Sequence, residues 1–336
     1  MDQKKVILAH GSGGKLSHEL VNQVFIPKFA NQALNKLDDQ AQVQVKDAKL
    51  AFSTDSFVVN PIMFPGGNIG KLAVCGTVND LAMGGAKPLY LSAGFIIEEG
   101  LPMETLEQIV ESMHRTAQEA GVEIVTGDTK VVEKGSADGI FINTAGIGLI
   151  PEGLDISGSN AQPGDVVIIN GFIGDHGIAV MAERQGLRFQ EAITSDCAPL
   201  NHLVADILAV TNQVRVFRDP TRGGVATTLN EIAEQSNVGI SLFEDRLPVR
   251  DSVRGVCEIL GLDPLYVANE GKLLAIVPAD RAEGVLAAMR ANEYGRDAQI
   301  IGEVTAEHPK KVVLETIVGG KRIVDMLAGA QLPRIC

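Results

Sequence analysis

The chain has 336 residues, a formal net charge of −13, 36 glycines, no tryptophan and a hydrophobic share of 45%. This length allows one large or two medium domains, and the composition is typical of a turn-rich α/β enzyme with an aliphatic core. The negative charge argues against a nucleic acid or an anionic membrane as partner. Residues 1–5 do not resemble a signal peptide and no 18-residue apolar run follows, so we expect a cytoplasmic protein.

The first half of the chain predicts one α+β unit that ends near residue 155. Its expected elements, in chain order, are a glycine-rich turn at 10–15, a strand at 50–59, a helix at 70–83, a strand at 89–97, an amphipathic helix from Pro102 to Gly121, and strands at 122–125 and 139–150. The strand at 122–125 is expected to end just before Asp128. The segment 151–163, rich in Gly, Ser and Pro, is the expected domain boundary.

The second half predicts another unit with a similar order of elements. These are a strand at 165–170, a helix after 174–177, a helix at 198–210, a strand at 214–217, a helix to about Gln235, a further strand and helix, a strand at 273–277, a helix at 279–291 and two short strands. We therefore divide the chain into an N-terminal domain (1–155), a C-terminal α/β domain (156–324) and a C-terminal tail (325–336). The tail is expected to be mobile because it contains Gly329 and ends in an extended stretch.

The four cysteines are scattered along the sequence and form no C-x-x-C pair, so neither a zinc site nor a disulfide framework is indicated. Cys75, Cys197 and Cys257 lie in apolar contexts and are expected in the core. Cys336 is the last residue, where a mobile tail would carry its thiol into a cleft or to a partner. The alternative is that this position is an accident of composition.

Known nucleotide-binding motifs are absent from the sequence. The segment 66–72 has Leu72 where a P-loop needs Ser or Thr, and no G-x-G-x-x-G follows a strand. Four aspartates instead lie beside small residues at the ends of expected elements: Asp55, Asp80, Asp128 and Asp219. Such carboxylates can bind Mg²⁺, which bridges nucleotide phosphates. Each aspartate taken singly is better explained as a cap or turn residue, and only the four in matching contexts favour a metal site.

Several motifs together resemble the HypE family of hydrogenase maturation proteins, from His10 to the last residue. They are His-Gly-Ser-Gly-Gly at 10–14, Phe-Ser-Thr-Asp-Ser at 52–56, Pro-Gly-Gly-Asn-Ile-Gly-Lys at 65–71, Asn-Asp at 79–80, Thr-Gly-Asp-Thr-Lys-Val-Val at 126–132, Asp-Pro-Thr-Arg-Gly-Gly at 219–224, Asn-Glu-Gly-Lys at 269–272 and Pro-Arg-Ile-Cys at 333–336. The aspartate and glycine motifs are shared with a wider superfamily that includes aminoimidazole ribonucleotide synthetase, selenophosphate synthetase and thiamine-monophosphate kinase. The terminal Pro-Arg-Ile-Cys is the specific part.

This resemblance implies a two-domain PurM-like α/β (α+β) fold and a homodimer whose N-terminal domains pair through a β-barrel. It implies ATP and Mg²⁺ in a cleft, and an ATP-dependent carbamoyl dehydratase as the activity. A carbamoyltransferase, HypF, would load the C-terminal thiol, and the S-carbamoyl group would be dehydrated to S-cyano. The cyanide would pass through a HypC–HypD complex to the iron of [NiFe]-hydrogenase.

The implied roles fall on residues of the matched motifs. Asp55, Asp80 and Asp128 are the expected Mg²⁺ and phosphate ligands. Nucleotide binding is expected from the glycine-rich segment Gly11, Gly13, Gly14 and Lys15, and from Asp219, Thr221, Arg222, Gly223 and Gly224. The first set has a flexible terminus as its alternative, and the second a structural turn. Cys336 is the expected acceptor.

The remaining roles concern the proton that leaves the carboxamide. Glu270 is the expected proton acceptor, kept ionised by Lys272, with a helix cap or a salt bridge as the alternative role. Lys130 is a weaker candidate to polarise the carboxamide. His10 and His176 lie beside glycines and are candidate loop donors with no catalytic role assigned.

Two other functions compete with this interpretation. One is a different ATP-using enzyme of the superfamily, although selenophosphate synthetase would require a Cys or selenocysteine within 11–15, where none occurs. The other is a non-catalytic carrier or scaffold whose tail passes a thiol-bound group between partners. Turnover of ATP distinguishes an enzyme from a carrier.

Overall fold

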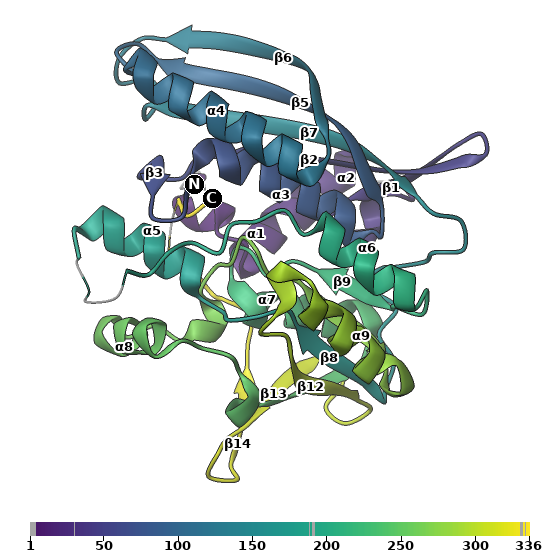
Figure 1. The fold of residues 1–336 in the computed structure, drawn as a ribbon. Helices are drawn as coiled ribbons and strands as arrows, with labels where there is room; N and C mark the ends of the chain where they lie inside the picture. Colours follow the sequence, from purple (N-terminus) through teal and green to yellow (C-terminus); the bar gives the residue numbers. More distant parts are fainter. Residues whose placement is uncertain (1–4, 30, 188, 190–191, 330–331, 333) are drawn as a thin grey trace.

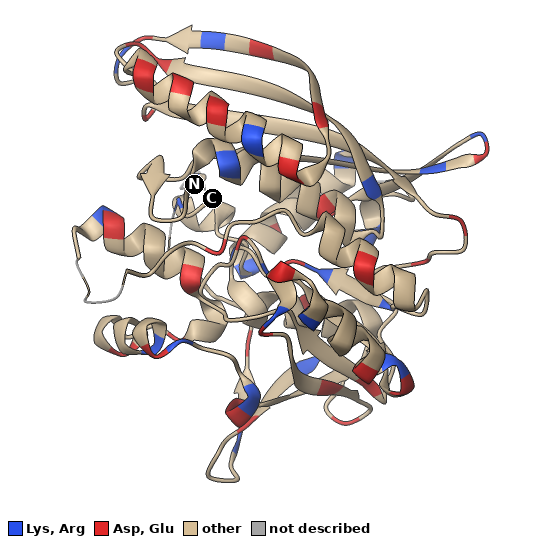
Figure 2. Cartoon of the chain, viewed as in Figure 1, with Lys and Arg blue, Asp and Glu red and all other residues tan. Residues whose placement is uncertain are grey.

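The computed structural model describes residues 5–29, 31–187, 189, 192–329, 332 and 334–336. The chain forms two α/β units, each built on its own sheet, and the last residue lies between the units (Figure 1). Among the described residues no helix is long and apolar enough to cross a membrane. Figure 2 shows acidic residues repeating along α4 and both signs of charge on each unit.

The first sheet has five strands in the order β1-β2-β7-β5-β6. Their bounds are β1 Ala41–Val45, β2 Ala48–Phe57, β5 Lys87–Glu98, β6 Glu123–Val132 and β7 Ile140–Ile150. Helices α3 (Ile69–Met83) and α4 (Met103–Ala120) cover one face (Figure 1). Helix α3 is buried nearly all round, and its first turn is capped by the side chain of Asn68, which accepts hydrogen bonds from the N–H groups of Gly70 and Lys71.

The other face of this sheet is uncovered by the described part of the chain and carries large apolar side chains. Alternation along the strands places Phe52, Tyr90, Ile96, Ile147 and Leu149 on this face, each at least 37% exposed. We call this surface the open face of the first sheet. A patch of neighbouring apolar side chains on a sheet is typical of a surface that another protein covers.

The second sheet has seven strands in the order β14-β13-β10-β12-β8-β11-β9. Their bounds are β8 Asp165–Ile169, β9 Val216–Arg218, β10 Gly239–Phe243, β11 Leu274–Pro278, β12 Gln299–Thr305, β13 Lys311–Glu315 and β14 Lys321–Val324. Helix α7 (Gly224–Ser236) packs on one face, and α6 (Asn201–Val210) and α9 (Ala279–Ala291) pack on the other. Ala82 and Met83 of α3 join the core under α6, which ties the two units together.

The remaining elements lie around the junction of the two units and at the edges. They are the helices α1 Lys15–Leu20, α2 Ile26–Phe29, α5 Asp175–Gln185 and α8 Asp251–Leu260, the two-stranded hairpin β3 Met63–Phe64 and β4 Gly67–Asn68, and short 3₁₀ or π turns at Leu8–Gly11, Val21–Phe25, Leu34–Lys36, Glu244–Arg246, Pro264–Tyr266 and Glu293–Gly295. The expected elements of both halves therefore exist, with small shifts at their ends.

One expectation is wrong in a way that affects the site. The strand expected at 122–125 continues through Asp128 to Val132, because β6 pairs in parallel with β5 along its whole length. Asp128 therefore lies in the middle of an edge strand and not at a strand end. The pairing with β5 overrides the strand end that Gly127-Asp128 indicates in the sequence.

Candidate active site

The end of the tail is docked between the two units. The backbone N–H of Val58 donates to the main-chain oxygen of Cys336 at 3.2 Å, and that of Asn60 donates to the carbonyl of Arg334 at 3.2 Å. The Arg334 side chain donates back to the Val58 carbonyl at 3.1 Å and pairs with Asp138. Ile335 is 1% exposed and Cys336 is 8% exposed. The terminal thiol is therefore held inside the protein, next to the end of β2.

The Cys336 thiol meets the Glu270 carboxyl in the interior. Burial raises the pKa of Cys336 far above its usual range, although the positive charge of Arg222 opposes this shift. The negative charge of Glu270 adds to the raised pKa of the Cys336 thiol. Glu270 is 3% exposed, and burial raises its pKa well above normal, with nearby acidic groups adding to the shift. Its Oε1 has no hydrogen-bond partner among the described residues.

The expectation that Lys272 keeps Glu270 ionised is wrong. The Lys272 ammonium is 3.0 Å from Asp196 Oδ2 and donates to the carbonyl of Gly271 at 3.0 Å. Asp196 Oδ1 also accepts from the N–H of Glu270 at 3.1 Å. Asp196 therefore holds the Lys272 ammonium and the Glu270 backbone, and no ion pair forms with the Glu270 carboxyl group among the described residues.

A cluster of aspartates lies beside this pair. Burial raises the pKa of Asp55, and burial together with the charges of Asp219, Asp55 and Asp39 raises that of Asp80 well above normal. Burial also raises the pKa of Asp219 to about 6. Ser53 donates to Asp80 Oδ2 at 2.6 Å. The structure thus brings together Asp55, Asp80 and Asp219, three of the four aspartates found in the sequence.

Asp39, Arg218 and Glu231 belong to the same surroundings but were not expected there. Arg218 Nε is 2.7 Å from Asp39 Oδ1, and its Nη2 is 2.6 Å from Glu231 Oε2. Burial raises the pKa of Asp39 well above normal, and Asp39 Oδ2 has no partner among the described residues. The sequence signal was present, since Arg218 directly precedes Asp219 and Asp39 follows Asp38 just before β1.

The acidic cluster fits a divalent cation chemically. Hard carboxylate oxygens crowded in a buried space, each raising the pKa of its neighbours, are relieved when a cation replaces the shared protons. No group of three or more His, Cys, Asp or Glu side chains within the described ranges is arranged to hold a metal by itself.

Asp128 and Lys130 lie apart from these residues in a single chain. Lys130 donates to Asp128 at 2.8 Å, which lowers the pKa of Asp128, and both side chains are at least 66% exposed. Both lie on the open face of the first sheet, whereas Asp55 points to the helical face. Strands β2 and β6 are three positions apart, about 14 Å at the usual spacing.

The glycine-rich N-terminal segment packs against Arg222 and the start of the tail. Arg222 donates to the carbonyl of Gly11 at 2.8 Å, and a Cβ at Gly13 would lie 2.9 Å from the Cβ and O atoms of Arg222. Lys15 donates its backbone N–H to Leu327 at 2.9 Å and its ammonium to Asp325 at 2.8 Å. A phosphate-covering role of this segment stays a prediction.

The turn after Asp219 has the backbone conformation that its glycines indicate. Gly223 and Gly224 have φ angles of +82° and +61°, and a Cβ at Gly224 would lie 2.5 Å from the Leu265 carbonyl. The N–H of Gly224 donates to the Thr221 carbonyl at 3.0 Å, which closes the turn at the start of α7. The turn thereby fixes Arg222 beside the docked tail.

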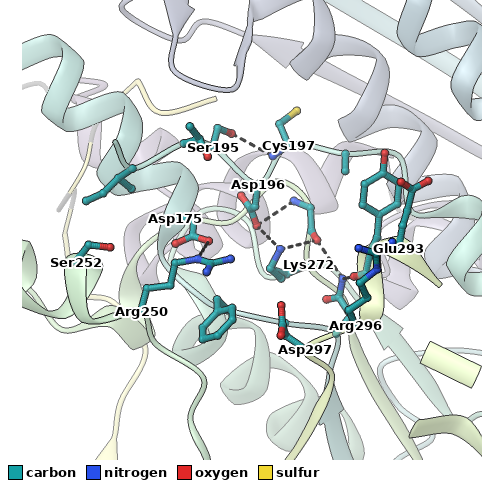
Figure 3. A pocket seen from close by; sticks show the side chains of 18 of the residues that line it. Asp175, Ser195, Asp196, Cys197, Arg250, Ser252, Lys272, Glu293, Arg296 and Asp297 are labelled. Carbon is teal, nitrogen blue, oxygen red and sulfur yellow. Dashed lines mark hydrogen bonds and ion pairs between the residues drawn. The ribbon is translucent and has the colours of Figure 1, made fainter. Parts of the chain in front are cut away.

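A cavity of about 600 Å³ lies beside the loop that holds Glu270. Figure 3 shows Lys272 and Asp196 in its centre, with Arg250 and Asp175 at one side and Arg296 and Asp297 at the other. The cavity also borders Cys197, which is buried and free, as are Cys75, Cys257 and Cys336. The cysteines expected in the core are confirmed there, and the docked tail places Cys336 with them.

The two units match two family models. Residues 37–150 match the N-terminal domain of AIR synthase related proteins, and residues 162–315 match the C-terminal domain of the same family. The chain therefore belongs to the AIR synthase related proteins, and the expected two-domain PurM-like fold is confirmed.

Relatives and solved structures show to which group within the AIR synthase related proteins the chain belongs. The carbamoyl dehydratase HypE of Azotobacter vinelandii is 54% identical over 331 residues, which cover 98% of this chain and 97% of the relative. A HypE–HypF complex matches with a TM-score of 0.88 at 53% identity, covering 92% of this chain and 99% of the other. HypE in complex with ATP matches with a TM-score of 0.84 at 51% identity, covering 99% and 100%. The chain belongs to the HypE family.

Proposed function

We propose that the chain is an ATP-dependent carbamoyl dehydratase that acts on its own C-terminal cysteine. The observation that carries this proposal is the buried Cys336 thiol close to Glu270, whose Oε1 has no partner among the described residues. A buried carboxyl oxygen without a partner is unusual, and here it lies where a group attached to Cys336 would have to fit. The relatives named carbamoyl dehydratase and the ATP-bound HypE structure support the same activity.

The residues fit the chemistry of dehydrating an S-carbamoyl group. ATP would phosphorylate the carboxamide oxygen as the nitrogen loses its first proton to solvent; the C–O bond then breaks with phosphate as the leaving group while the second N–H proton is lost and the nitrile forms. Glu270 would accept that proton, because a carboxylate with a raised pKa is a stronger base once ionised. Docking the tail makes the step effectively intramolecular.

Arg222 and the aspartates serve the phosphate side of the site. Mg²⁺ bound by Asp55 and Asp80 would neutralise phosphate charge there. Arg222 lies near Cys336, Asp55 and Glu270, where its positive charge favours the ionised forms of all three groups. Asp219, Thr221, Gly223 and Gly224 hold the turn that carries Arg222, and Gly11, Gly13, Gly14 and Lys15 pack beside it. We assign these residues to the nucleotide side of the site.

We further propose that two chains pair through the open face of the first sheet, as the β-barrel of the PurM-like fold requires. The exposed apolar side chains on that face support this pairing. Pairing would carry Asp128 and Lys130 of each chain toward the site of the partner chain. These two residues of the matched motifs could then serve the partner's site, although they lie far from the site of their own chain. The division at residue 155 is supported by the two sheets, which lie on either side of it.

The proposed partners follow from the same activity. A carbamoyltransferase of the HypF kind would load Cys336, as the HypE–HypF complex structure suggests, and a HypC–HypD complex would accept the cyanide for the iron of [NiFe]-hydrogenase. The cytoplasm, where a hydrogenase is assembled, is the proposed location.

The test is the mass of the C-terminal peptide. The purified chain is incubated with carbamoyl phosphate, a HypF-type carbamoyltransferase, ATP and Mg²⁺, and the Cys336 peptide is analysed with and without ATP turnover. We expect a carbamoyl adduct that converts to a cyano adduct as ATP is consumed. A carbamoyl adduct that never converts, in the presence of ATP, would identify a carrier and overturn the proposal.

A further inference from the structure

A buried histidine holds the backbone of the tail one residue before the reactive cysteine. His176, the second residue of α5, is 0% exposed. Its Nε2 is 2.9 Å from the carbonyl oxygen of Ile335, and its Nδ1 is 2.8 Å from Ser195 Oγ. Because a carbonyl can only accept, Nε2 carries the proton and Nδ1 accepts from the Ser195 hydroxyl. Burial lowers the pKa of His176, which agrees with a neutral ring.

The loop that receives His176 also holds the proposed base. Ser195 Oγ accepts from the N–H of Cys197 at 3.1 Å, and Ser195 N–H donates to the carbonyl of Pro65 at 2.8 Å. The next residue, Asp196, accepts from the N–H of Glu270 and binds Lys272 (Figure 3). One short loop therefore orients the base through Asp196 and, through Ser195 and His176, the tail that carries the substrate.

The hydrogen bond between His176 and the Ile335 carbonyl lies next to Cys336 and therefore restricts the orientation of that residue. The main-chain oxygen of Cys336 is bound by Val58 on one side of the cysteine, and the carbonyl of Ile335 is bound by His176 on the other. With both oxygens held, the Cα of Cys336 cannot turn freely, and its thiol is kept near Glu270. Without His176, the buried Ile335 carbonyl would be left without a partner, which disfavours the docked tail.

We propose that His176 is a positioning residue for the dehydration step: it locks the penultimate carbonyl of the tail to the loop that orients Glu270. His176 does not touch the reacting atoms. The inference deepens the proposed function and rests on it for the catalytic consequence, whereas the docking of the tail can be measured without catalysis.

Two substitutions separate the two hydrogen bonds of the ring. His176→Gln places an amide near the position of Nε2 and can still donate to Ile335. His176→Asn places its amide near Nδ1, keeps a partner for Ser195 and cannot reach the tail. His202→Asn is the matched control, because His202 also contacts a backbone carbonyl, that of Glu119, at 3.0 Å but lies outside the tail's surroundings.

The first measurement is the alkylation rate of Cys336 by iodoacetamide in the full-length protein without ATP, followed by the mass of the C-terminal peptide. Losing one hydrogen bond to a buried carbonyl should favour the undocked tail by roughly tenfold. We expect the alkylation rate of Cys336 to rise roughly tenfold in His176→Asn, to change little in His176→Gln and to stay the same in His202→Asn. Equal rates in His176→Asn and the parent chain would overturn the proposal, even if the enzyme is active.

The second measurement is turnover of the carbamoylated tail at saturating ATP. We expect His176→Asn to lower kcat roughly tenfold or more while the KM for ATP changes less than about twofold, with partial rescue in His176→Gln. An equal decrease of kcat in His176→Asn and His176→Gln, with equal decreases of melting temperature, would show that His176 has a merely structural role and would contradict the proposal. If His176→Asn does not fold, Ser195→Ala replaces it in the alkylation measurement. We expect this variant to raise the alkylation rate of Cys336 by a smaller factor. An unchanged alkylation rate would contradict the proposal.

Discussion

The carboxyl group of Glu270 and the thiol of Cys336 lie close together in the interior, although 65 residues of chain separate them. Burial raises the pKa of both groups, and the thiol keeps its proton in the docked state. The thiol is therefore a poor nucleophile where it lies. We infer that Cys336 is loaded with its carbamoyl group when the tail is undocked, and is dehydrated after it returns.

Replacement of Cys336 by Ala should abolish the modification and leave the fold intact. The side chain is small and is the last of the chain, so its loss should change the free energy of unfolding by about 1 kcal/mol or less. Peptide mass spectrometry and urea denaturation on one preparation measure both effects. Carbamoylation at another site of the Cys336→Ala chain would contradict the assignment.

Replacement of Glu270 by Gln should stop nitrile formation while leaving loading and ATP binding in place. Loss of a general base typically lowers the rate by about 10²–10⁴-fold, and Gln has nearly the size of the protonated acid. Product mass and ATP affinity are measured on the same protein, with thermal melting as the control for stability. If the variant is stable and forms the nitrile at the normal rate, Glu270 is not the base, and Lys130 becomes the next candidate.

The pH dependence of stability should reveal the acidic cluster. The pKa of Asp219 is raised from 3.8 to about 6, so the native state binds this proton more tightly than the unfolded chain does. The stabilising effect is complete below about pH 4 and is lost as the pH rises through 6, a change of up to about 3 kcal/mol.

Urea denaturation of the parent chain and of Asp219→Asn between pH 4 and 8 measures this difference. We expect the parent chain to lose stability relative to the variant as the pH rises, and Mg²⁺ to reduce the loss at pH 8 because it favours the ionised carboxylates. A difference that is constant across this range would show that Asp219 has an ordinary pKa.

ATP binding in the presence of Mg²⁺ should weaken in each of the variants Asp55→Asn, Asp80→Asn and Asp128→Asn. The first two remove charge from the buried cluster, and the third acts across the proposed dimer. Calorimetry with and without Mg²⁺ measures the affinity. Unchanged affinity in all three would remove these residues from the nucleotide site.

Mixing two inactive variants tests whether Asp128 acts on the partner's site. In a heterodimer of Asp128→Asn and Glu270→Gln chains, one of the two sites would contain both normal residues. Random pairing should then restore about a quarter of the parent activity. Asp219→Asn mixed with Glu270→Gln is the matched control, because both changes affect the same chain's site and no activity should return. An inactive Asp128→Asn and Glu270→Gln mixture that contains heterodimers would argue against a shared site.

Gly14→Ala should disturb the contact between the N-terminal segment and the tail. A Cβ at Gly14 would lie 2.2 Å from the Leu327 carbonyl oxygen, whereas nothing lies within 4 Å of a Cβ at Gly11. We expect Gly14→Ala to cost about 1–3 kcal/mol of stability or to displace the start of the tail, with Gly11→Ala near neutral. Thermal melting and alkylation of Cys336 measure the two effects, and equal behaviour of the two variants would contradict the packing.

The sequence by itself determined most helices and strands and the side chains that are candidates for the chemistry. Periodicity indicated α3, α4 and α9 close to their observed bounds, and short motifs indicated Asp55, Asp80, Asp219, Glu270 and Cys336 as candidate functional residues. These features are local, since helical spacing, turn residues and short motifs are specified within a few neighbouring positions.

Tertiary structure decided which of these residues meet. Pairing with β5 extended β6 and carried Asp128 onto the open face, and Lys272 formed its ion pair with Asp196 and not with Glu270. His176 acquired its contact with the tail across 159 residues of sequence. These contacts depend on the order of the strands and on which side chains become buried. Burial raises or lowers a pKa only after distant segments of the chain have packed together. No local sequence pattern could therefore specify them.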